Sequence, residues 1–208
     1  MIIEIYQDTI CPWCRIGKKK LFDAIEQWDG QPLTIRYRAY QLNPDTPKEG
    51  LPFWESMAAM KGGMDVVGQM VQHAANAGEA AGVPFRFDQV KKWPHTFASH
   101  QLIKLAPADK QTSVLDAVYR AYFEDGQDIG QLDVLLRIAG EHGMDPDETR
   151  RQIEAGEKAD EIEEDLRYAA ELQITGVPFF IIDGKFALSG AHPVENFLKA
   201  FQQAAETP

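Results

Sequence analysis

The stretch DTICPWCRIG, residues 8–17, contains both cysteines of a chain of 208 residues. Cys11 and Cys14 are three positions apart, so in a helix they lie on the same face, about one turn from each other. A disulfide bond tolerates that separation of Cα atoms. Pro12 favours the first position of a helix, because its missing N–H leaves no hydrogen bond unmade there. The stretch therefore predicts a helix that begins beside two cysteines able to form a disulfide.

The segments around this stretch predict a strand, a helix and a second strand. Residues 2–8 alternate in character and are rich in Ile, which favours a short strand. Apolar residues at helical spacing continue from Ile16 to Trp28, so we expect the helix to end near residue 30. Residues 33–40 form the second predicted strand. The cysteine pair then lies where the first strand passes into the helix.

The long middle of the chain, residues 45–173, has a helical period instead. It opens in a turn-rich segment with several prolines, and residues 145–148, Asp-Pro-Asp-Glu, carry the signals of a helix start. We expect little strand in this region and helices near residues 53–61, 64–81, 95–105, 110–124, 131–142, 146–155 and 158–173.

Strands return near the end of the chain. Residues 176–183 are typical of a buried strand, residues 185–189 of a second strand after a turn, and an amphipathic helix follows residue 192. Pro178 cannot donate a hydrogen bond to a sheet, so its place at the start of a buried strand needs a reason. A cis Val177–Pro178 bond would give one, because it would turn the Val177 backbone toward the cysteines to pair with extended substrate.

The charge of the chain limits its partners. It has 21 Lys and Arg against 32 Asp and Glu, a formal net charge of −11. Such a charge repels nucleic acid and anionic membrane surfaces, so we expect neither as a partner. The first residues lack the basic start of a signal peptide, and no stretch has the roughly 18 apolar residues of a membrane span. We therefore expect a cytoplasmic protein, in which isolated cysteines serve redox or metal chemistry rather than structural disulfides.

Cys11 is predicted to be the nucleophile. It lies at the expected N-cap of the helix, where free N–H groups and the positive end of the helix dipole favour a thiolate. Arg15 and the lysines at 18–20 add positive charge nearby in the sequence. Cys14, one turn further in, is predicted to be the resolving thiol. We expect these two residues to form the catalytic centre.

Two other interpretations of the cysteine pair are ordinary helical cysteines and a zinc site completed by His95 and His100. Compact zinc modules keep their ligand pairs close in sequence, whereas these pairs lie far apart. We therefore expect a dithiol–disulfide centre with no metal. For the two histidines we expect core or capping roles rather than catalysis.

Trp13 and a group of methionines are candidates for substrate contact. Trp13 is predicted to be exposed and to form an apolar platform beside the attacking sulfur, and the alternative is packing against the helical region. The methionines could line a flexible groove, although their helical spacing favours an ordinary core. They are Met57, Met60, Met64 and Met70.

Four motifs together resemble a known family. They are Asp8-x-x-Cys11-Pro12-Trp13-Cys14-x-x-Gly17, Pro94-His95-Thr96 with His100, Gly176-Val177-Pro178, and Ser189-Gly190-Ala191. They are similar to the DsbA-like family of thioredoxin-fold proteins, and more narrowly to its FrnE-like branch. The resemblance implies an α/β chain with a thioredoxin-like domain at 1–44 and 174–208 and an all-helical insertion at 45–173. The chain has His95 and His192 where the branch usually or often has Asn and Gln.

The resemblance also implies a function. Members of this family are thiol:disulfide oxidoreductases that act on protein or small-molecule thiols, so we expect Trp13, Val177 and Pro178 to contact substrate. No cofactor is implied beyond the redox-active disulfide, with glutathione as a candidate co-substrate. Kappa-class glutathione transferases and 2-hydroxychromene-2-carboxylate isomerases share the fold but typically have Ser where this chain has Cys11. A redox-inactive peptide-binding module or holdase is the other alternative, and the sequence indicates no oligomeric state.

Overall fold

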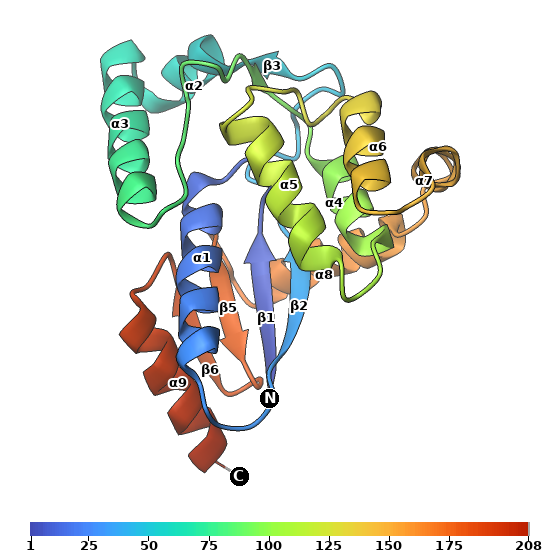
Figure 1. Cartoon of the computed structure of the whole chain (residues 1–208). Coiled ribbons are helices and arrows are strands. Elements are labelled where there is room, and N and C mark those ends of the chain that lie inside the picture. Colours follow the sequence, from blue (N-terminus) through green and yellow to red (C-terminus); the bar gives the residue numbers. More distant parts are fainter. Residues whose placement is uncertain (208) are drawn as a thin grey trace.

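The computed structural model describes residues 1–207 and shows a four-stranded sheet in the order β2-β1-β5-β6. The strands are β1 (Ile2–Gln7), β2 (Thr34–Ala39), β5 (Phe179–Ile182) and β6 (Phe186–Ser189). β1 is parallel to β2 and antiparallel to β5, and β5 is antiparallel to β6. A parallel pair needs a crossover connection, which here is helix α1 (Pro12–Gln27). The predicted strand–helix–strand opening is therefore confirmed (Figure 1).

Alternate residues of the central strands face opposite layers of helix. Ile3 and Ile5 of β1 belong to the main core, which also contains residues of α1 and of the last helix, α9 (Val194–Glu206). Tyr6 of β1 faces the other way and packs in a second cluster with Ala169 of α8 (Ala159–Glu171). The period of two along a strand explains this division. The sheet is thus covered on both faces, as the α/β class requires.

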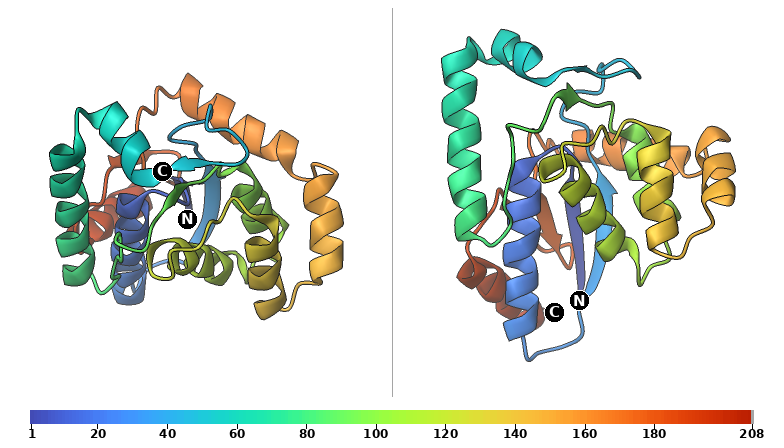
Figure 2. Two further views of the ribbon diagram at one scale, coloured as in Figure 1. Left: turned by 90° about the horizontal axis from the view of Figure 1, so that it is seen from above. Right: turned by 45° about the horizontal axis from the view of Figure 1, so that its top comes forward.

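The helices of the middle region match the predicted ranges to within two residues at each end. They are α2 (Phe53–Lys61), α3 (Met64–Ala80), α4 (Phe97–Leu105), α5 (Gln111–Phe123), α6 (Leu132–Glu141), α7 (Pro146–Glu154) and α8. α2 and α3 stand over the N-terminal end of α1, whereas α4 to α7 lie to one side of it (Figures 1 and 2). The end of α1 that carries the cysteines is therefore covered by the middle region.

One feature of the middle region was not predicted. Two short strands, β3 (Leu51–Pro52) and β4 (Lys92–Trp93), form an antiparallel pair. They join the start of α2 to the segment before α4. This pair fixes the turn-rich segment that follows residue 43 beside the connection that leads to α4.

α8 is held to the sheet by a buried carboxylate. The Asp165 side chain accepts a hydrogen bond from the backbone N–H of Ala39 at 2.9 Å and pairs with Arg38 at 2.9 Å and Lys104 at 2.6 Å. The boundary of the inserted domain at residue 173 stays a prediction. The packing of α8 on β2 favours a boundary before that helix, because it covers the sheet. None of the helices within residues 1–207 has the length and apolar character needed to cross a membrane.

Candidate active site

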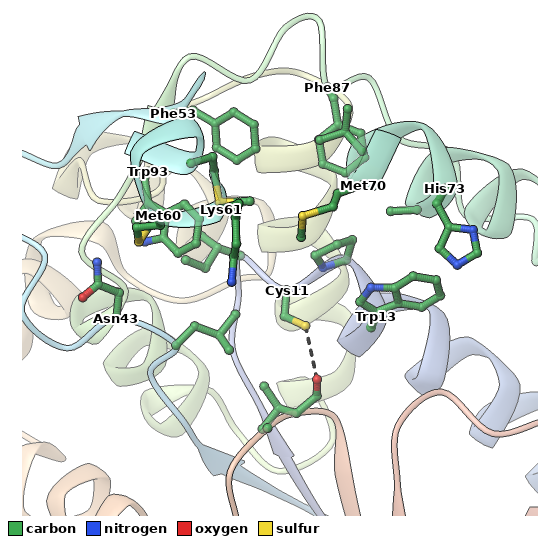
Figure 3. A pocket seen from close by; sticks show the side chains of 18 residues that line it. Cys11, Trp13, Asn43, Phe53, Met60, Lys61, Met70, His73, Phe87 and Trp93 are labelled. Atoms are coloured by element: carbon green, nitrogen blue, oxygen red, sulfur yellow. Dashed lines mark hydrogen bonds between the residues drawn. The ribbon is translucent and has the colours of Figure 1, made fainter. Parts of the chain in front are cut away.

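Cys11 is the N-cap residue of α1, directly after the loop that leaves β1. Its N–H donates to the Asp8 carbonyl at 3.0 Å, and its own carbonyl accepts from Cys14 N–H at 3.1 Å. The two cysteines are free thiols, 3% and 1% exposed. The Cys11 sulfur was expected to accept hydrogen bonds from the first turn of the helix, but it makes no such cap. Instead, Cys11 Sγ faces the Val177 carbonyl at 3.5 Å (Figure 3).

The basic residues that follow the cysteines are engaged elsewhere. Arg15 donates to the Pro84 carbonyl at 2.7 Å and pairs with Glu124. Lys18 pairs with both carboxylate oxygens of Asp116 at 2.8 Å, and burial lowers its pKa against the opposing effect of that carboxylate. These contacts hold α1 against the middle region. The expected contribution of these residues to the charge at Cys11 stays a prediction, beside the positive potential that the N-terminus of α1 supplies.

Cys14 is placed to keep its proton. Burial raises its pKa well above the ordinary value of a thiol, and so do a hydrogen bond with Cys11 and the charge of that residue. The charge of the Asp8 carboxylate also raises it, whereas a hydrogen bond with the Asp8 backbone has the opposite effect. The thiol nearer to the cavity can then react while the inner one stays protonated. Asp8 was predicted only as one position of the Cys-x-x-Cys motif, without a role of its own.

Asp8 lies in a buried polar cluster behind the cysteines. One of its oxygens accepts from Leu42 N–H at 2.7 Å, and the other lies 3.4 Å from Nε2 of His100. The same His100 nitrogen is 3.0 Å from the Tyr40 carbonyl. Asp8 is 0% and His100 2% exposed, so the pair is shielded from water. His100 thus connects α4 to the loop that carries the cysteines, a role in the core rather than at the surface.

His95 takes a different place from the one expected. It was assigned to the start of a helix together with His100, but α4 begins two residues later, at Phe97. His95 lies in the segment before it, where burial lowers its pKa. Over residues 1–207 no three His, Cys, Asp or Glu side chains gather in a group suited to a metal ion. The set of Cys11, Cys14, His95 and His100 is therefore not assembled as a zinc site.

Replacement of Asp8 by Asn is expected to change the pH dependence of the inner thiol. The negative charge of Asp8 is one cause of the raised pKa of Cys14, so its removal lowers that pKa. The attack of Cys14 on a mixed disulfide at Cys11 requires the thiolate, and its rate should then rise at lower pH than in the wild type. Stopped-flow measurement of glutathione release tests this, with the Cys11–glutathione adduct formed and held at acid pH, where Cys14 keeps its proton, and then mixed to each higher pH. Asp133→Asn, at an exposed site, is the control, and an unchanged or upward-shifted profile in Asp8→Asn would contradict the role of its charge.

The Val177–Pro178 segment packs directly on α1. The Val177–Pro178 peptide bond is cis. A Cβ atom on Gly17 would lie 2.8 Å from Cγ of Pro178 and 3.1 Å from the Phe180 ring. Glycine in a helix costs about 1 kcal/mol relative to alanine, so Gly17 needs such a reason to be there. It lets the proline approach the helix and so sets the distance between the Val177 carbonyl and Cys11.

Gly17→Ala is therefore expected to be harmful although alanine favours a helix. Overpacking costs about 1–3 kcal/mol, so after the gain of about 1 kcal/mol in helix propensity we expect the free energy of unfolding to fall by up to about 2 kcal/mol. Gly68→Ala on α3 is the matched control, because nothing lies within 4 Å of a Cβ atom there. That variant should be neutral or more stable. Urea unfolding of both proteins compares them, and equal stability would show that the close packing at Pro178 is unimportant.

A cavity of about 540 Å³ opens beside Cys11, beneath α2 and α3. Trp13 lines it but is half-buried rather than exposed, and its ring packs against His73 of α3 at a centroid distance of 5.3 Å. The alternative of packing against the helical region is thus confirmed, and a role of Trp13 as a platform for substrate stays a prediction. Val177 also lines the cavity, whereas Pro178 is not part of its wall. Cys11, Trp13 and Val177 thus line the same cavity, and Figure 3 shows Trp13 beside Cys11.

The methionines belong mainly to this cavity rather than to the core. Met57 is buried, but Met60 and Met70 are 47% and 41% exposed, and all three line the cavity. Met64 is 51% exposed and lies outside it. The preference for an ordinary core is confirmed for Met57, which also belongs to the main core, and was wrong for the three exposed methionines. Helical spacing could not separate a core face from a cavity face, because both bury apolar side chains on one side of a helix.

The sheet, its two helical layers and the Cys-x-x-Cys pair at the start of α1 define a class of protein: a thioredoxin-like fold with a helical region inserted between its halves. The sequence profile of the DSBA-like thioredoxin domain matches residues 2–202, and the chain belongs to that family. The predicted fold class and family are therefore confirmed.

Individual relatives agree with this assignment. The Bacillus subtilis (strain 168) protein YwbO is 28% identical over an alignment of 208 positions, gaps included. This alignment covers 95% of this chain and 94% of YwbO. A probable DsbA oxidoreductase of known crystal structure, SCO1869 from Streptomyces coelicolor, is 30% identical, with a TM-score of 0.92 over 100% of this chain and 91% of that one. The cytosolic disulfide reductase DsbM from Pseudomonas aeruginosa, in its structure with GSH, is 17% identical, with a TM-score of 0.68 over 99% and 96% of the two chains. At that identity DsbM shows the fold alone.

Proposed function

We propose that the protein is a thiol:disulfide oxidoreductase whose centre is the pair Cys11 and Cys14. The observation that carries the proposal is the asymmetry of the two thiols. Cys11 lies at a helix N-terminus and lines a cavity, while Cys14 is buried one turn further in with a raised pKa. This is the arrangement that an attacking and a resolving thiol need. Within the DsbA-like family, the resemblance of the site motifs supports the proposal that the protein belongs to the FrnE-like branch.

The reaction is a pair of thiol–disulfide exchanges. The Cys11 thiolate attacks one sulfur of a substrate disulfide, so that a mixed disulfide forms and one substrate thiolate leaves. Cys14 then loses its proton and attacks the Cys11 sulfur, which closes the Cys11–Cys14 disulfide and releases the second substrate thiol. The substrate gains two electrons, and the protein is oxidised. In reverse, the same steps oxidise a dithiol, and the substrates are protein or small-molecule thiols and disulfides.

Val177 is proposed to respond to the first step. Its carbonyl accepts a hydrogen bond from the Cys11 thiol at 3.5 Å in the reduced protein. Loss of the thiol proton removes that donor, so the carbonyl becomes available for a donor on the substrate. Trp13 contributes an apolar surface in the cavity beside Cys11, and Pro178 holds the Val177 segment against Gly17. These three residues are the proposed substrate-binding group.

Glutathione is the proposed source of electrons. The structure of DsbM with GSH shows that another protein of this fold binds this thiol, which supports the proposal. Two glutathione molecules would reduce the Cys11–Cys14 disulfide through a Cys11–glutathione adduct and leave as oxidised glutathione. DsbM is described as cytosolic, and we propose the same compartment for this protein.

The proposal is tested by equilibrating the protein with glutathione and glutathione disulfide and by following insulin reduction. The Cys11–Cys14 pair should cycle between dithiol and disulfide, and insulin reduction should be lost in Cys11→Ser. A holdase or peptide-binding module would suppress aggregation of an unfolded protein equally well in that variant. A glutathione-dependent isomerase would turn over without oxidation of either cysteine. Insulin reduction that is unchanged in Cys11→Ser would contradict the assignment.

A further inference from the structure

We propose that the cavity beside Cys11 selects small disulfides that combine an apolar arm with an anionic group, and that Lys61 binds the anion. The inference rests on the proposed exchange reaction and names its substrate class. It is carried by three properties of the cavity: its control of access to the sulfur, the chemistry of its wall and the sign of its charge.

Access to Cys11 is the first of these. The Cys11 side chain is only 3% exposed, and the cavity beneath α2 and α3 is the open space on which it borders. Two sulfur atoms must approach end to end in a disulfide exchange, so a disulfide has to enter this space before it can react. The volume of about 540 Å³ lies within the range of small-molecule sites. A small disulfide therefore fits this approach better than a disulfide held on the surface of a folded protein.

The wall of the cavity is mainly apolar. Phe53, Phe87 and Trp93 form one side, with the rings of Phe53 and Phe87 stacked at 6.3 Å and those of Phe53 and Trp93 at 6.2 Å. Met57 and Met70 line the same cavity, and Figure 3 shows Met70 above Cys11. Methionine side chains are flexible and polarisable, so they adapt to an aromatic or aliphatic arm. Burial of such an arm supplies the binding free energy.

The charge of the wall selects the other end of the ligand. The protein has a net charge of −11, yet no Asp or Glu is among the residues that line the cavity within residues 1–207. Lys61, the last residue of α2, lines it, is exposed and forms no ion pair with any described residue. In Figure 3 its ammonium group extends toward the side of the cavity where Cys11 lies. A cation at the edge of an apolar chamber binds a carboxylate on a ligand whose apolar part lies inside.

The electron balance follows the proposed exchange. The Cys11 thiolate attacks the sulfur joined to the apolar arm, and the other half of the ligand leaves as a thiolate. Cys14 then displaces the apolar thiol, so that one disulfide becomes two thiols and the protein carries the Cys11–Cys14 disulfide. Two molecules of a second low-molecular-weight thiol, of which glutathione is the example, together return two electrons to the protein and leave as its disulfide. Each cycle consumes one substrate disulfide and produces one glutathione disulfide.

The experiment uses the reduced full-length protein and three disulfide probes. Dithiobis(nitrobenzoate) is aromatic and anionic, dithiodipyridine is aromatic and neutral at pH 7, and hydroxyethyl disulfide is small and polar. The rate of reaction at Cys11 with each probe is divided by the rate of free glutathione with the same probe, which cancels intrinsic reactivity. We expect the normalised rate to be largest for dithiobis(nitrobenzoate) and smallest for hydroxyethyl disulfide.

Paired variants separate the charge from the apolar wall. Lys61→Gln should lower the normalised rate for dithiobis(nitrobenzoate) by about two- to fivefold, as expected for one exposed ion pair, and leave dithiodipyridine unchanged. High salt should reproduce that loss in the wild type. Lys199→Gln on α9 makes the same charge change far from the cavity and should have no effect. Met70→Gln should slow both aromatic probes, whereas Met64→Gln, on the same helix but outside the cavity, should not.

The outcomes distinguish this inference from the proposed function. Equal normalised rates for the three probes would overturn the inference alone, because exchange would proceed without selection. Faster normalised reduction of insulin than of any small probe would overturn it in favour of polypeptide substrates. A lack of reaction between Cys11 and every disulfide would overturn the proposed function, and the inference with it.

Discussion

Cys14→Ser is expected to leave the protein covalently joined to its substrate through Cys11. The Cys11 thiol can still attack a disulfide from its place beside the cavity, and the mixed disulfide still forms. Serine at position 14 cannot displace the substrate, because a hydroxyl does not attack a disulfide at a measurable rate. Turnover with glutathione should fall by at least about 100-fold, in line with the loss of one of the two exchange steps. Intact-mass spectrometry without reductant should show one adduct per chain.

The reciprocal variant identifies which thiol attacks. Cys11→Ser leaves Cys14, which is 1% exposed and has a pKa raised by burial, as the remaining thiol. It should form no adduct with glutathione disulfide under the conditions that fully modify Cys14→Ser. An adduct at Cys14 in this variant, together with an unmodified Cys11 in the other, would reverse the two roles. Far-UV circular dichroism of both variants checks that serine has not changed the fold.

The fold was predictable because its signals are local. The period of two in β1, the helical period after Pro12 and the run before Asp183 each arise within a few residues, and all three appear at the predicted places. β3 and β4 have only two residues each, too few for any periodicity, so the sequence carried no signal for them. The start of α4 was placed two residues early because His95 and Thr96 continue the helical spacing without belonging to the helix.

The centre of the site was predictable for the same reason, and its surroundings were not. Cys11 and Cys14 form a motif within one turn, but the partner of Cys11 is the carbonyl of Val177, 166 positions away. His100 approaches Asp8 only after the middle region has folded over α1. Arg15 and Lys18 were expected beside the sulfur, because sequence distance gives no information on the direction of a side chain. Likewise the cavity needs α2, α3 and β4 together, and no single segment shows it.

Asp165→Asn is expected to be among the most destabilising changes outside the active site. Asp165 is 1% exposed and receives the Ala39 N–H and the cations of Arg38 and Lys104. Asparagine keeps the volume of the side chain but turns an N–H₂ group toward at least one of these donors and removes the negative charge. Loss of one partner from a buried ion pair costs about 3–5 kcal/mol. For a chain of this size that corresponds to a fall of roughly 10 °C in Tm.

Asp133→Asn provides the comparison that isolates burial from charge. Asp133 pairs with Arg150 at 2.7 Å, but its side chain is 88% exposed, and exposed pairs contribute at most about 1 kcal/mol. Both substitutions remove one negative charge from an ion pair with Arg, so a difference in unfolding free energy reports the environment rather than the net charge. Chemical denaturation of the two reduced proteins at one pH and salt concentration makes the measurement. Equal losses would mean that the Asp165 cluster does not hold α8 to the sheet, and the fixation of that helix would then depend on the apolar contacts around Tyr6 and Ala169.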